Sequence, residues 1–246
     1  MKYILGLRAV EEWLHSRSRA GTLFLAKETK RNTALAELAA KKGFRVEKIS
    51  EKELAAKAGS TDHRGILLAL REDALTKDKK STIPSYEELH DDALILILDC
   101  ITDPRNVGAI LRSADLFSAD LIVVPKDRAV SGAPAVTKTS AGADAFLPVL
   151  EAVNLSREIG KCKAAGFWVF GADMAGKPVW AADLTGKVAV VLGSEGKGLR
   201  PNVKKQCDDL IAIPQSGHID SFNVSVAAGI ILYEIRRQQV ISVREG

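Results

Sequence analysis

The chain has 246 residues, of which 46% are hydrophobic and 27% charged, and its formal net charge is +4. This length allows one large domain or two small ones, each with its own core, and the composition is typical of a globular protein. No apolar run approaches the roughly 18 residues that a membrane span needs, and the first residues lack a signal-peptide pattern. We therefore expect a cytoplasmic protein without a membrane anchor.

The N-terminal part predicts a small α/β domain at residues 1–72. Hydrophobic periodicity predicts helices at 9–15, 33–42 and 51–57 and strands at 23–26, 44–49 and 65–70. This part holds 15 basic against 9 acidic residues, a balance of +6, whereas the remainder holds 20 against 22. The basic excess could meet nucleic-acid phosphates; alternatively, it is a chance imbalance on a solvated surface.

A linker is predicted at residues 73–92, which contain a charged run followed by Ser, Thr and Pro. A longer β/α alternation then fills residues 93–246. Strands are predicted at 94–98, 121–124, 167–170, 188–192 and 210–213, and helices at 106–117 and 225–238. The continuous apolar run at 94–98 is typical of a strand buried on both faces, so we expect a parallel sheet.

The first loop of chemical interest follows the strand at 94–98 and opens the next helix. It contains Asn106 and Arg112, which can both lie near the crevice at the strand ends, where α/β proteins bind ligands. The guanidinium of Arg112 offers a planar fork for a phosphate. Alternatively, Arg112 pairs with Asp115 on the helix surface.

The second loop, at 191–201, has three glycines in six residues directly after a strand, so its backbone can approach a ligand closely. Two familiar phosphate-binding patterns fail: Lys197 is not followed by Ser or Thr, and the loop lies too late in the chain for a dinucleotide fingerprint. Glu195 would repel a polyphosphate. A small neutral or cationic ligand fits better, and a plain glycine-rich turn is the alternative.

The third loop follows the strand at 210–213 and leads into the last helix. Ser221 or Asn223 can cap that helix, and the small residues at 227–229 allow close packing. Capping alone does not explain why a polar Ser-Phe-Asn sequence lies beside a strand end and the glycine loop.

Metal and disulfide sites are not expected. Cys100, Cys162 and Cys207 are too widely spaced for a zinc pattern or a disulfide framework, and Cys100 is interpreted as a small buried hydrophobe. His63 and His218 are interpreted as surface or hydrogen-bonding residues.

Together, the three loops resemble the motifs of the SpoU/TrmH branch of the SPOUT methyltransferases. The matching segments are DPRNVGAILR at 103–112, LGSEGKGL at 192–199, and IP at 213–214 followed by SFNVSVA at 221–227. Segments ILGLRAV at 4–10 and HRGI at 63–66 resemble the substrate-binding domain of the family, which is similar to ribosomal L30e proteins. The two-domain layout looks most like the bacterial ribosomal RNA guanosine-2′-O-methyltransferases.

The resemblance implies an α/β fold: a parallel-sheet SPOUT domain with a C-terminal trefoil knot, preceded by a small L30e-like α/β domain. It also implies S-adenosylmethionine as cofactor, RNA as substrate, with ribosomal RNA favoured over transfer RNA, and a homodimer that shares its sites between subunits. The apolar residues Ile230, Ile231, Leu232 and Ile235 of the last helix, with the small residues at 227–229, are expected to face the second subunit.

Two sets of site residues follow from the resemblance. The catalytic set is Asn106, Arg112, Glu195, Ser221 and Asn223. The cofactor-binding set is Leu192, Gly193, Gly198, Ile213 and Phe222, where Phe222 replaces the Leu that is usual in the family.

The role of Arg112 has two interpretations. The family assigns the residue at this position the role of base, but a guanidinium is effectively always protonated, so a phosphate clamp that orients the ribose is physically simpler. Glu195 would then hold Arg112 or the substrate, and Ser221 and Asn223 would position the hydroxyl or the residues of the first loop.

Three other functions are alternatives: a transfer RNA 2′-O-methyltransferase, a non-catalytic RNA-binding module, and a nicotinamide-dependent oxidoreductase. The complete set of polar site residues argues against the second, and the missing dinucleotide fingerprint argues against the third.

Overall fold

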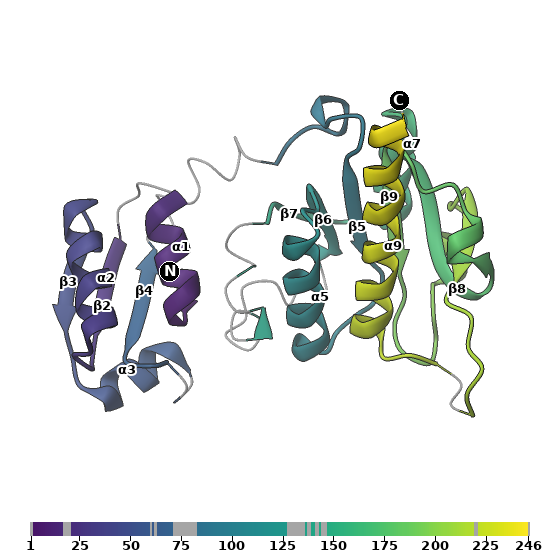
Figure 1. Ribbon diagram of the computed structural model, residues 1–246. Helices are drawn as coiled ribbons and strands as arrows, with labels where there is room; N and C mark the ends of the chain where they lie inside the picture. The colour runs from purple at the N-terminus through teal and green to yellow at the C-terminus, as the bar shows by residue number, and fades with distance from the viewer. Residues whose placement is uncertain are drawn as a thin grey trace. The chain divides into compact units, whose positions relative to one another are not determined.

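The computed structural model describes residues 2–16, 21–59, 61, 63–70, 83–126, 136, 139–140, 143, 147–218 and 221–245. The chain divides into two compact units, the first built on a four-stranded sheet and the second on a six-stranded sheet (Figure 1). Residues 73–82 of the expected linker lie outside the described residues. The rest of that segment carries a 3-10 helix, η1 (Tyr86–Glu88), whose Tyr86 is buried in the core of the second unit. The expected domain limits stay a prediction.

The first unit combines four strands with three helices. Its elements are β1 (Lys2–Leu5), α1 (Leu7–Ser16), β2 (Gly21–Leu25), α2 (Lys30–Lys41), β3 (Arg45–Lys48), α3 (Glu51–Ala58) and β4 (Ile66–Leu70). The strand order is β1-β4-β2-β3, with β4 antiparallel to β1 and β2, and β2 parallel to β3. Thr29 caps α2, and a Ser50–Glu53 capping box begins α3.

Both faces of this small sheet are covered. Leu68 and Leu70 of β4 pack in one cluster with α1 and α2, whereas Leu67 and Ala69 pack with Leu54 of α3. Since successive side chains of a strand point to opposite faces, an entirely apolar β4 fits between two helical layers. His63 is buried, and its Nδ1 accepts a hydrogen bond from the Gly65 amide, as expected of a hydrogen-bonding His.

The second unit is a parallel α/β domain. Its elements are β5 (Leu94–Leu98), α5 (Pro104–Leu116), β6 (Leu121–Pro125), β7 (Val149–Ala152), α7 (Leu155–Ala164), β8 (Trp168–Pro178), η4 (Val179–Ala181), β9 (Val188–Leu192), α8 (Pro201–Lys204), β10 (Asp209–Ala212) and α9 (Val224–Glu245). All strand pairs in the order β10-β8-β9-β5-β6-β7 are parallel, which confirms the expected sheet. The trefoil knot stays a prediction.

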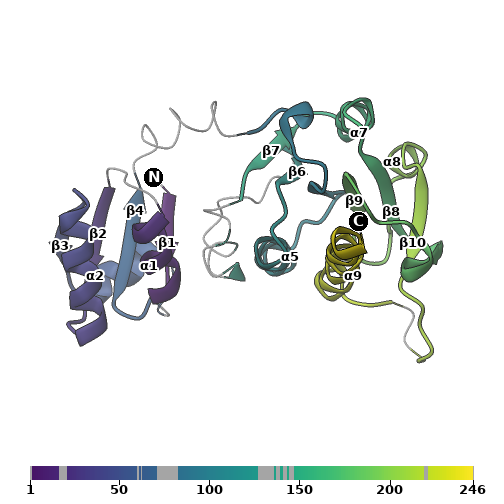
Figure 2. The same cartoon turned by 45° about the horizontal axis from the view of Figure 1, so that its top comes forward.

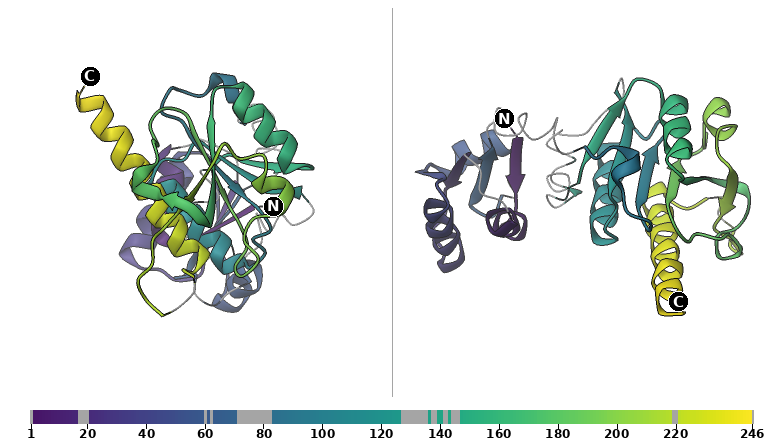
Figure 3. Two further views of the ribbon diagram at one scale, coloured as in Figure 1. Left: turned by 90° about the vertical axis from the view of Figure 1, so that its right-hand side faces the viewer. Right: turned by 90° about the horizontal axis from the view of Figure 1, so that it is seen from above.

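Helices cover both faces of this sheet. α7 packs on one face, against a cluster that includes Ile95, Ile97 and Val191. α5 and α9 lie side by side on the other face (Figures 2 and 3). Strands β5, β6 and β9 are buried along their whole length, as a sheet between two helical layers requires. In the described part of the chain, no helix is long and apolar enough to cross a membrane.

Helices α5 and α9 contact each other near the C-terminal end of α5. Near the start of α9, Gly229 lies close to Ser113 of α5, and a side-chain carbon at Gly229 would lie 3.9 Å from the Ser113 hydroxyl. Near the middle of α9, the Arg236 guanidinium donates hydrogen bonds to the carbonyls of Phe117 (2.7 Å) and Ser118 (2.5 Å), which follow α5. These bonds satisfy carbonyls that the helix end leaves without partners.

Candidate active site

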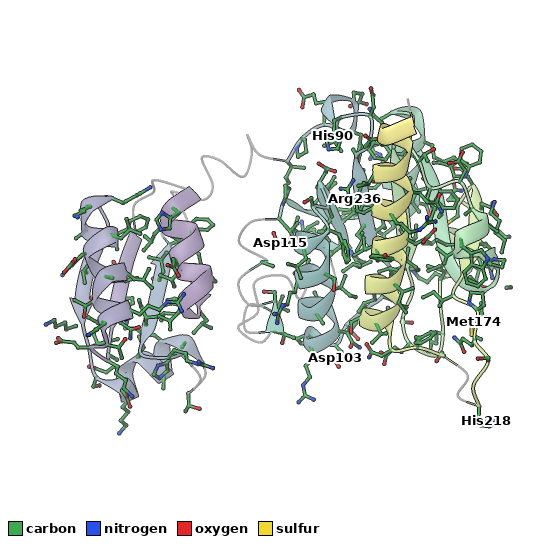
Figure 4. The ribbon with its side chains drawn as sticks, in the orientation of Figure 1. His90, Asp103, Asp115, Met174, His218 and Arg236 are labelled. Atoms are coloured by element: carbon green, nitrogen blue, oxygen red, sulfur yellow. The ribbon has the colours of Figure 1, made fainter. Side chains whose placement is uncertain are left out.

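The candidate site lies where four strands end at the same edge of the six-stranded sheet. From β5 the chain proceeds outward to β6 and β7, whereas β9, β8 and β10 lie on the other side of β5. Ligands of α/β proteins bind beyond the carboxyl ends of the strands at such a reversal. In Figure 4, Asp103 and Met174 mark this edge and His90 marks the opposite one.

A cavity of about 600 Å³ opens at this edge. It is lined by residues 172–174 within β8, 192–198 from the last residue of β9 onward, 211–213 and 215 from β10 onward, and 221, 222, 224, 227 and 231 at the start of α9. Its volume falls in the range of roughly 300–1,000 Å³ that is usual for small-molecule sites. All five residues predicted to bind the cofactor, Leu192, Gly193, Gly198, Ile213 and Phe222, line this one cavity.

The glycine-rich loop after β9 forms one wall of the cavity. Ser194 and Gly198 exchange two backbone hydrogen bonds of 3.1 and 2.9 Å, which close the loop on itself. A side-chain carbon on Gly193 would overlap the backbone of Gly198, so only glycine fits there. Gly196 and Gly198 have positive φ angles of 77° and 63°. The glycines are therefore required by the loop geometry and leave its backbone accessible to a ligand.

A polar cluster beside the cavity joins the three predicted loops. Glu195 Oε1 accepts hydrogen bonds from Asn106 Nδ2 (3.1 Å), Asn223 Nδ2 (2.5 Å) and the Val224 amide (3.3 Å). Asn223 Nδ2 also donates to Asn106 Oδ1 (3.0 Å). Three of the predicted catalytic residues, separated by up to 117 positions, are thus in direct contact.

Local structure explains why these side chains meet. Asp103 caps α5 by accepting a bond from the Arg105 amide, and Pro104 occupies the first turn, so Asn106 lies at the start of that helix. Asn223 caps α9: its Oδ1 accepts bonds from the amide (3.0 Å) and hydroxyl (2.6 Å) of Ser225. Of the two capping candidates in the third loop, Asn223 is the one that caps.

Arg112 and Ser221 do not belong to this cluster. Arg112 is exposed on α5, and within the described residues the alternative salt bridge between Arg112 and Asp115 is not observed. Glu195 holds Asn106 and Asn223 rather than Arg112 of its own chain. Ser221 is exposed and lines the cavity.

Several cavity residues were not predicted from the sequence. Asp173 and Met174 line the cavity because β8 continues to Pro178, well beyond the predicted strand. Burial of Asp173 acts to raise its pKa, but hydrogen bonds from Lys204 Nζ and the Ala175 amide outweigh it, so the pKa lies below its ordinary value. The part of the cavity wall formed by β8 therefore carries a carboxylate that is paired with Lys204.

No group of three or more potential metal ligands occurs among the residues that the structure describes. Cys100 is half-buried rather than fully buried as expected, and its backbone is left-handed, with a φ of 61°. His218 is exposed at the tip of the loop after β10 (Figure 4).

Two protein-family models match this chain. The SpoU rRNA Methylase family matches residues 93–233, which contain the cavity and the polar cluster. The RNA 2'-O ribose methyltransferase substrate binding family matches residues 3–74. The chain belongs to the SpoU rRNA methylase family.

Individual proteins agree with this assignment. The chain is 38% identical over 243 residues to the 23S rRNA (guanosine-2'-O-)-methyltransferase RlmB of Coxiella burnetii, covering 97% of this chain and 96% of that protein. It is 37% identical to a putative TrmH family tRNA/rRNA methyltransferase of Bacillus subtilis, with 96% of each chain covered. A crystal structure of an AdoMet-bound rRNA methyltransferase from Sinorhizobium meliloti has the same fold, with a TM-score of 0.77, 24% identity, and coverage of 96% of this chain and 87% of that one.

Family membership confirms the class of enzyme predicted from the loops, an RNA methyltransferase, and the Sinorhizobium structure confirms the fold class.

Proposed function

We propose that this SpoU-family enzyme methylates the ribose 2′-hydroxyl of a guanosine in 23S ribosomal RNA. The observation that carries the proposal is the position of Glu195, which lines the cavity and also joins Asn106 to Asn223 in the polar cluster. A pocket of cofactor size and a group of polar side chains from three loops thus share one residue. The choice of guanosine in 23S RNA is supported by the name of the Coxiella relative.

S-adenosylmethionine fits the cavity in size and in chemistry. The walls offer apolar side chains, Leu192, Ile213 and Phe222, together with the exposed backbone of the closed glycine loop. Such walls can enclose an adenine ring, while the carboxylate of Glu195 suits the cationic groups of the ligand. When bound, this cofactor supplies an electrophilic methyl group on a sulfonium.

Within the cluster, Asn223 acts by positioning other residues. Both hydrogens of its Nδ2 are used by Asn106 and Glu195, and its Oδ1 accepts two bonds from Ser225. A side-chain amide in this state has little capacity left for a substrate. Asn223 therefore holds Asn106 and Glu195 in place, which is the second of the two roles expected for it.

Glu195 is the group best suited to receive the ribose hydroxyl. Its Oε1 accepts three bonds from the protein, whereas within the described residues no bond to Oε2 is formed. An anionic oxygen with free capacity can accept the hydroxyl hydrogen and orient the oxygen for attack. Ser221, exposed at the same cavity, can add a further hydrogen bond to the RNA.

Arg112 serves the site of a second subunit in this proposal. Arg105, Ala109, Arg112 and Leu116 follow one another at helical spacing, so they share one face of α5. Asn106 lies on a different face of that helix, together with Ser113, which approaches Gly229 of α9. Arg112 therefore points away from the cluster of its own chain.

Exposed apolar side chains on α9 and α5 suit contact with a second copy of the chain. Val226, Tyr233 and Val240 are exposed at intervals of seven residues along α9, and Leu116 of the neighbouring α5 is 73% exposed. A two-fold dimer through this surface would cover these side chains and bring each Arg112 to the partner. The planar guanidinium is then available to clamp an RNA phosphate.

The prediction of which residues of α9 face a second subunit was partly wrong. Ile231, Leu232 and Ile235 are 2% exposed or less, because they face the sheet of their own chain. Gly229 faces Ser113 of α5 in the same chain, at a distance where a side-chain carbon would make an ordinary contact. The exposed stripe lies on another side of α9.

In this proposal, the N-terminal unit, which matches the substrate-binding family, binds the RNA phosphates through its excess of basic residues. The enzyme works in the cytoplasm, where ribosomal RNA is available. Mapping of 2′-O-methyl groups on ribosomal and transfer RNA from cells with and without the protein tests the proposal. We expect the loss of one guanosine methylation in 23S RNA. Loss of a methyl group from a transfer RNA instead would contradict the proposed substrate but support the proposed reaction. If no RNA loses a methyl group, both the proposed substrate and the proposed reaction are wrong.

A further inference from the structure

Asp99, the residue after β5, is entirely buried and lies behind the glycine loop rather than in the cavity. Its Oδ2 accepts a hydrogen bond from the Arg200 amide (2.8 Å), and its Oδ1 accepts one from Arg200 Nε (2.6 Å). Its own amide donates to the Leu192 carbonyl (2.7 Å). One buried residue thus contacts Leu192 and Arg200, which stand on either side of the loop formed by residues 193–199.

The contacts made by Asp99 complete the closure of this loop. Inside the loop, Ser194 and Gly198 hold one another through two backbone bonds, and Gly193 lies against the Gly198 backbone. These contacts fix the middle of the loop. The two ends are fixed relative to each other by Asp99, through one backbone bond at Leu192 and two side-chain bonds at Arg200.

We infer that Asp99 is a positioning residue that holds the glycine loop in the shape that receives the cofactor. The inference rests on the proposed function, because it assigns the loop to S-adenosylmethionine. Asp99 does not touch the cavity and would act only through the loop backbone.

Its chemistry favours this role over simple packing. A buried carboxylate is costly unless it is paired and hydrogen-bonded, and an apolar residue would continue the run of β5 at no such cost. The Arg200 side chain is 48% exposed, so its salt bridge with Asp99 holds a half-exposed cation at the end of the loop. The left-handed backbone of Cys100 marks the sharp turn that the chain makes directly after Asp99.

Asp99→Asn is the sharpest test, because it keeps the shape but replaces one acceptor by a donor that faces Arg200. We expect the Kd of S-adenosylmethionine, measured by calorimetry, to rise about tenfold, which corresponds to about 1.4 kcal/mol. In the cofactor-free protein, amide hydrogen exchange at Ser194 and Gly198 should accelerate. Affinity for RNA should not change.

Two further variants separate positioning from general stability. Arg200→Ala removes the half-exposed partner, so it tests the same contact if Asp99→Asn does not fold, and Arg200→Lys should restore part of the affinity. Glu158→Gln is the matched control, since Glu158 is also a buried acid, paired with Tyr86 (2.9 Å) and Lys161 (2.8 Å) away from the cavity. It should lower the melting temperature and leave the cofactor Kd unchanged.

The outcomes are distinct. Folded Asp99→Asn or Arg200→Ala protein with the wild-type Kd and wild-type amide exchange overturns the inference alone. An equal rise of the Kd in Glu158→Gln overturns it as well, because loss of stability would then explain the effect. If the wild-type protein does not bind S-adenosylmethionine, the proposed function fails and the inference fails with it.

Discussion

Asn223 Nδ2 donates to Glu195 Oε1 at 2.5 Å, which joins the first residue before α9 to the glycine loop after β9. The same amide nitrogen donates to Asn106 at the start of α5. The cap of α9, the glycine loop in the cavity wall and the start of α5 are therefore linked by hydrogen bonds between Asn223, Glu195 and Asn106. Changes at any of the three side chains should affect the geometry of the others.

Glu195 provides the first prediction. Glu195→Ala removes the common acceptor of the cluster and should lower kcat roughly 100-fold, the lower end of what a positioned acid or base contributes. Glu195→Gln keeps an acceptor at Oε1 but loses the free anionic oxygen, so it should also be strongly impaired. Methyl transfer from labelled cofactor to RNA measures both. A Gln variant with full kcat would show that Glu195 only holds its neighbours.

Asn223 provides the second prediction. Asn223→Ala removes the cap of α9 and should lower the free energy of unfolding by about 1 kcal/mol, besides reducing activity. Ser225→Ala is the control, because it removes one bond to Asn223 and leaves the contacts to Glu195 and Asn106 intact. Thermal unfolding and methyl transfer measure the two effects. Equal loss of activity in the two variants would contradict the positioning role of Asn223.

Arg112 is predicted to act in the site of the partner subunit. Arg112→Lys keeps the charge but loses the fork, so activity should fall roughly 100-fold while cofactor binding stays. Arg112→Ala and Asn223→Ala, co-expressed and purified as a mixed dimer, should recover roughly half of the wild-type activity, because one site of such a dimer carries both lesions and the other none. A mixed dimer that stays inactive while binding cofactor and RNA would place both residues in the same subunit.

The exposed stripe on α9 predicts the dimer surface. Tyr233→Glu adds a charge to a side chain that is 58% exposed beside Phe117, and should convert a dimer into monomers in analytical ultracentrifugation. Val153→Glu is the control, since Val153 is 87% exposed outside α5 and α9. Dissociation by both variants, or by neither, would contradict the assignment of this surface.

Two thiols provide a prediction on pH. Burial raises the pKa of Cys162 to about 12 and that of Cys207 to about 11, from an ordinary value of 9.0. At pH 8 both should react slowly with a thiol reagent in the folded protein and rapidly in denaturant. As the pH rises above 9.0, thiols of the unfolded chain ionise first, so the folded state should lose stability toward pH 12. Equal reaction rates with and without denaturant would contradict this.

The central strands and the glycine loop could be predicted because their signals are local. The apolar runs at Leu94–Leu98 and Val188–Leu192 coincide with β5 and β9. By contrast, β7 (Val149–Ala152) and α7 (Leu155–Ala164) were not predicted. β7 is only four residues long and partly exposed, and α7 buries few side chains, among them Glu158. The apolar pattern of α7 consists of only three residues at helical spacing, Leu155, Ile159 and Cys162, and is therefore a weak signal.

Features that depend on long-range packing were harder to predict. An aspartate after an apolar run is typical of a loop, and nothing near Asp99 in the sequence indicates that Arg200 lies against it. The apolar residues of α9 were assigned to a second subunit, although Ile231 and Ile235 face their own sheet. A helix with apolar residues on more than one face does not reveal by periodicity which face is internal.

The walls of the cavity come from residues 172–231, although the chain has already built three strands of the surrounding sheet before that segment begins. During translation, the nascent chain can therefore fold its first unit and pair β5 with β6 and β7 before any pocket for the methyl donor exists. A polypeptide truncated before residue 221 would lack the last wall and the Asn223 cap. Release of partly synthesised chains should thus not produce fragments that sequester the cofactor.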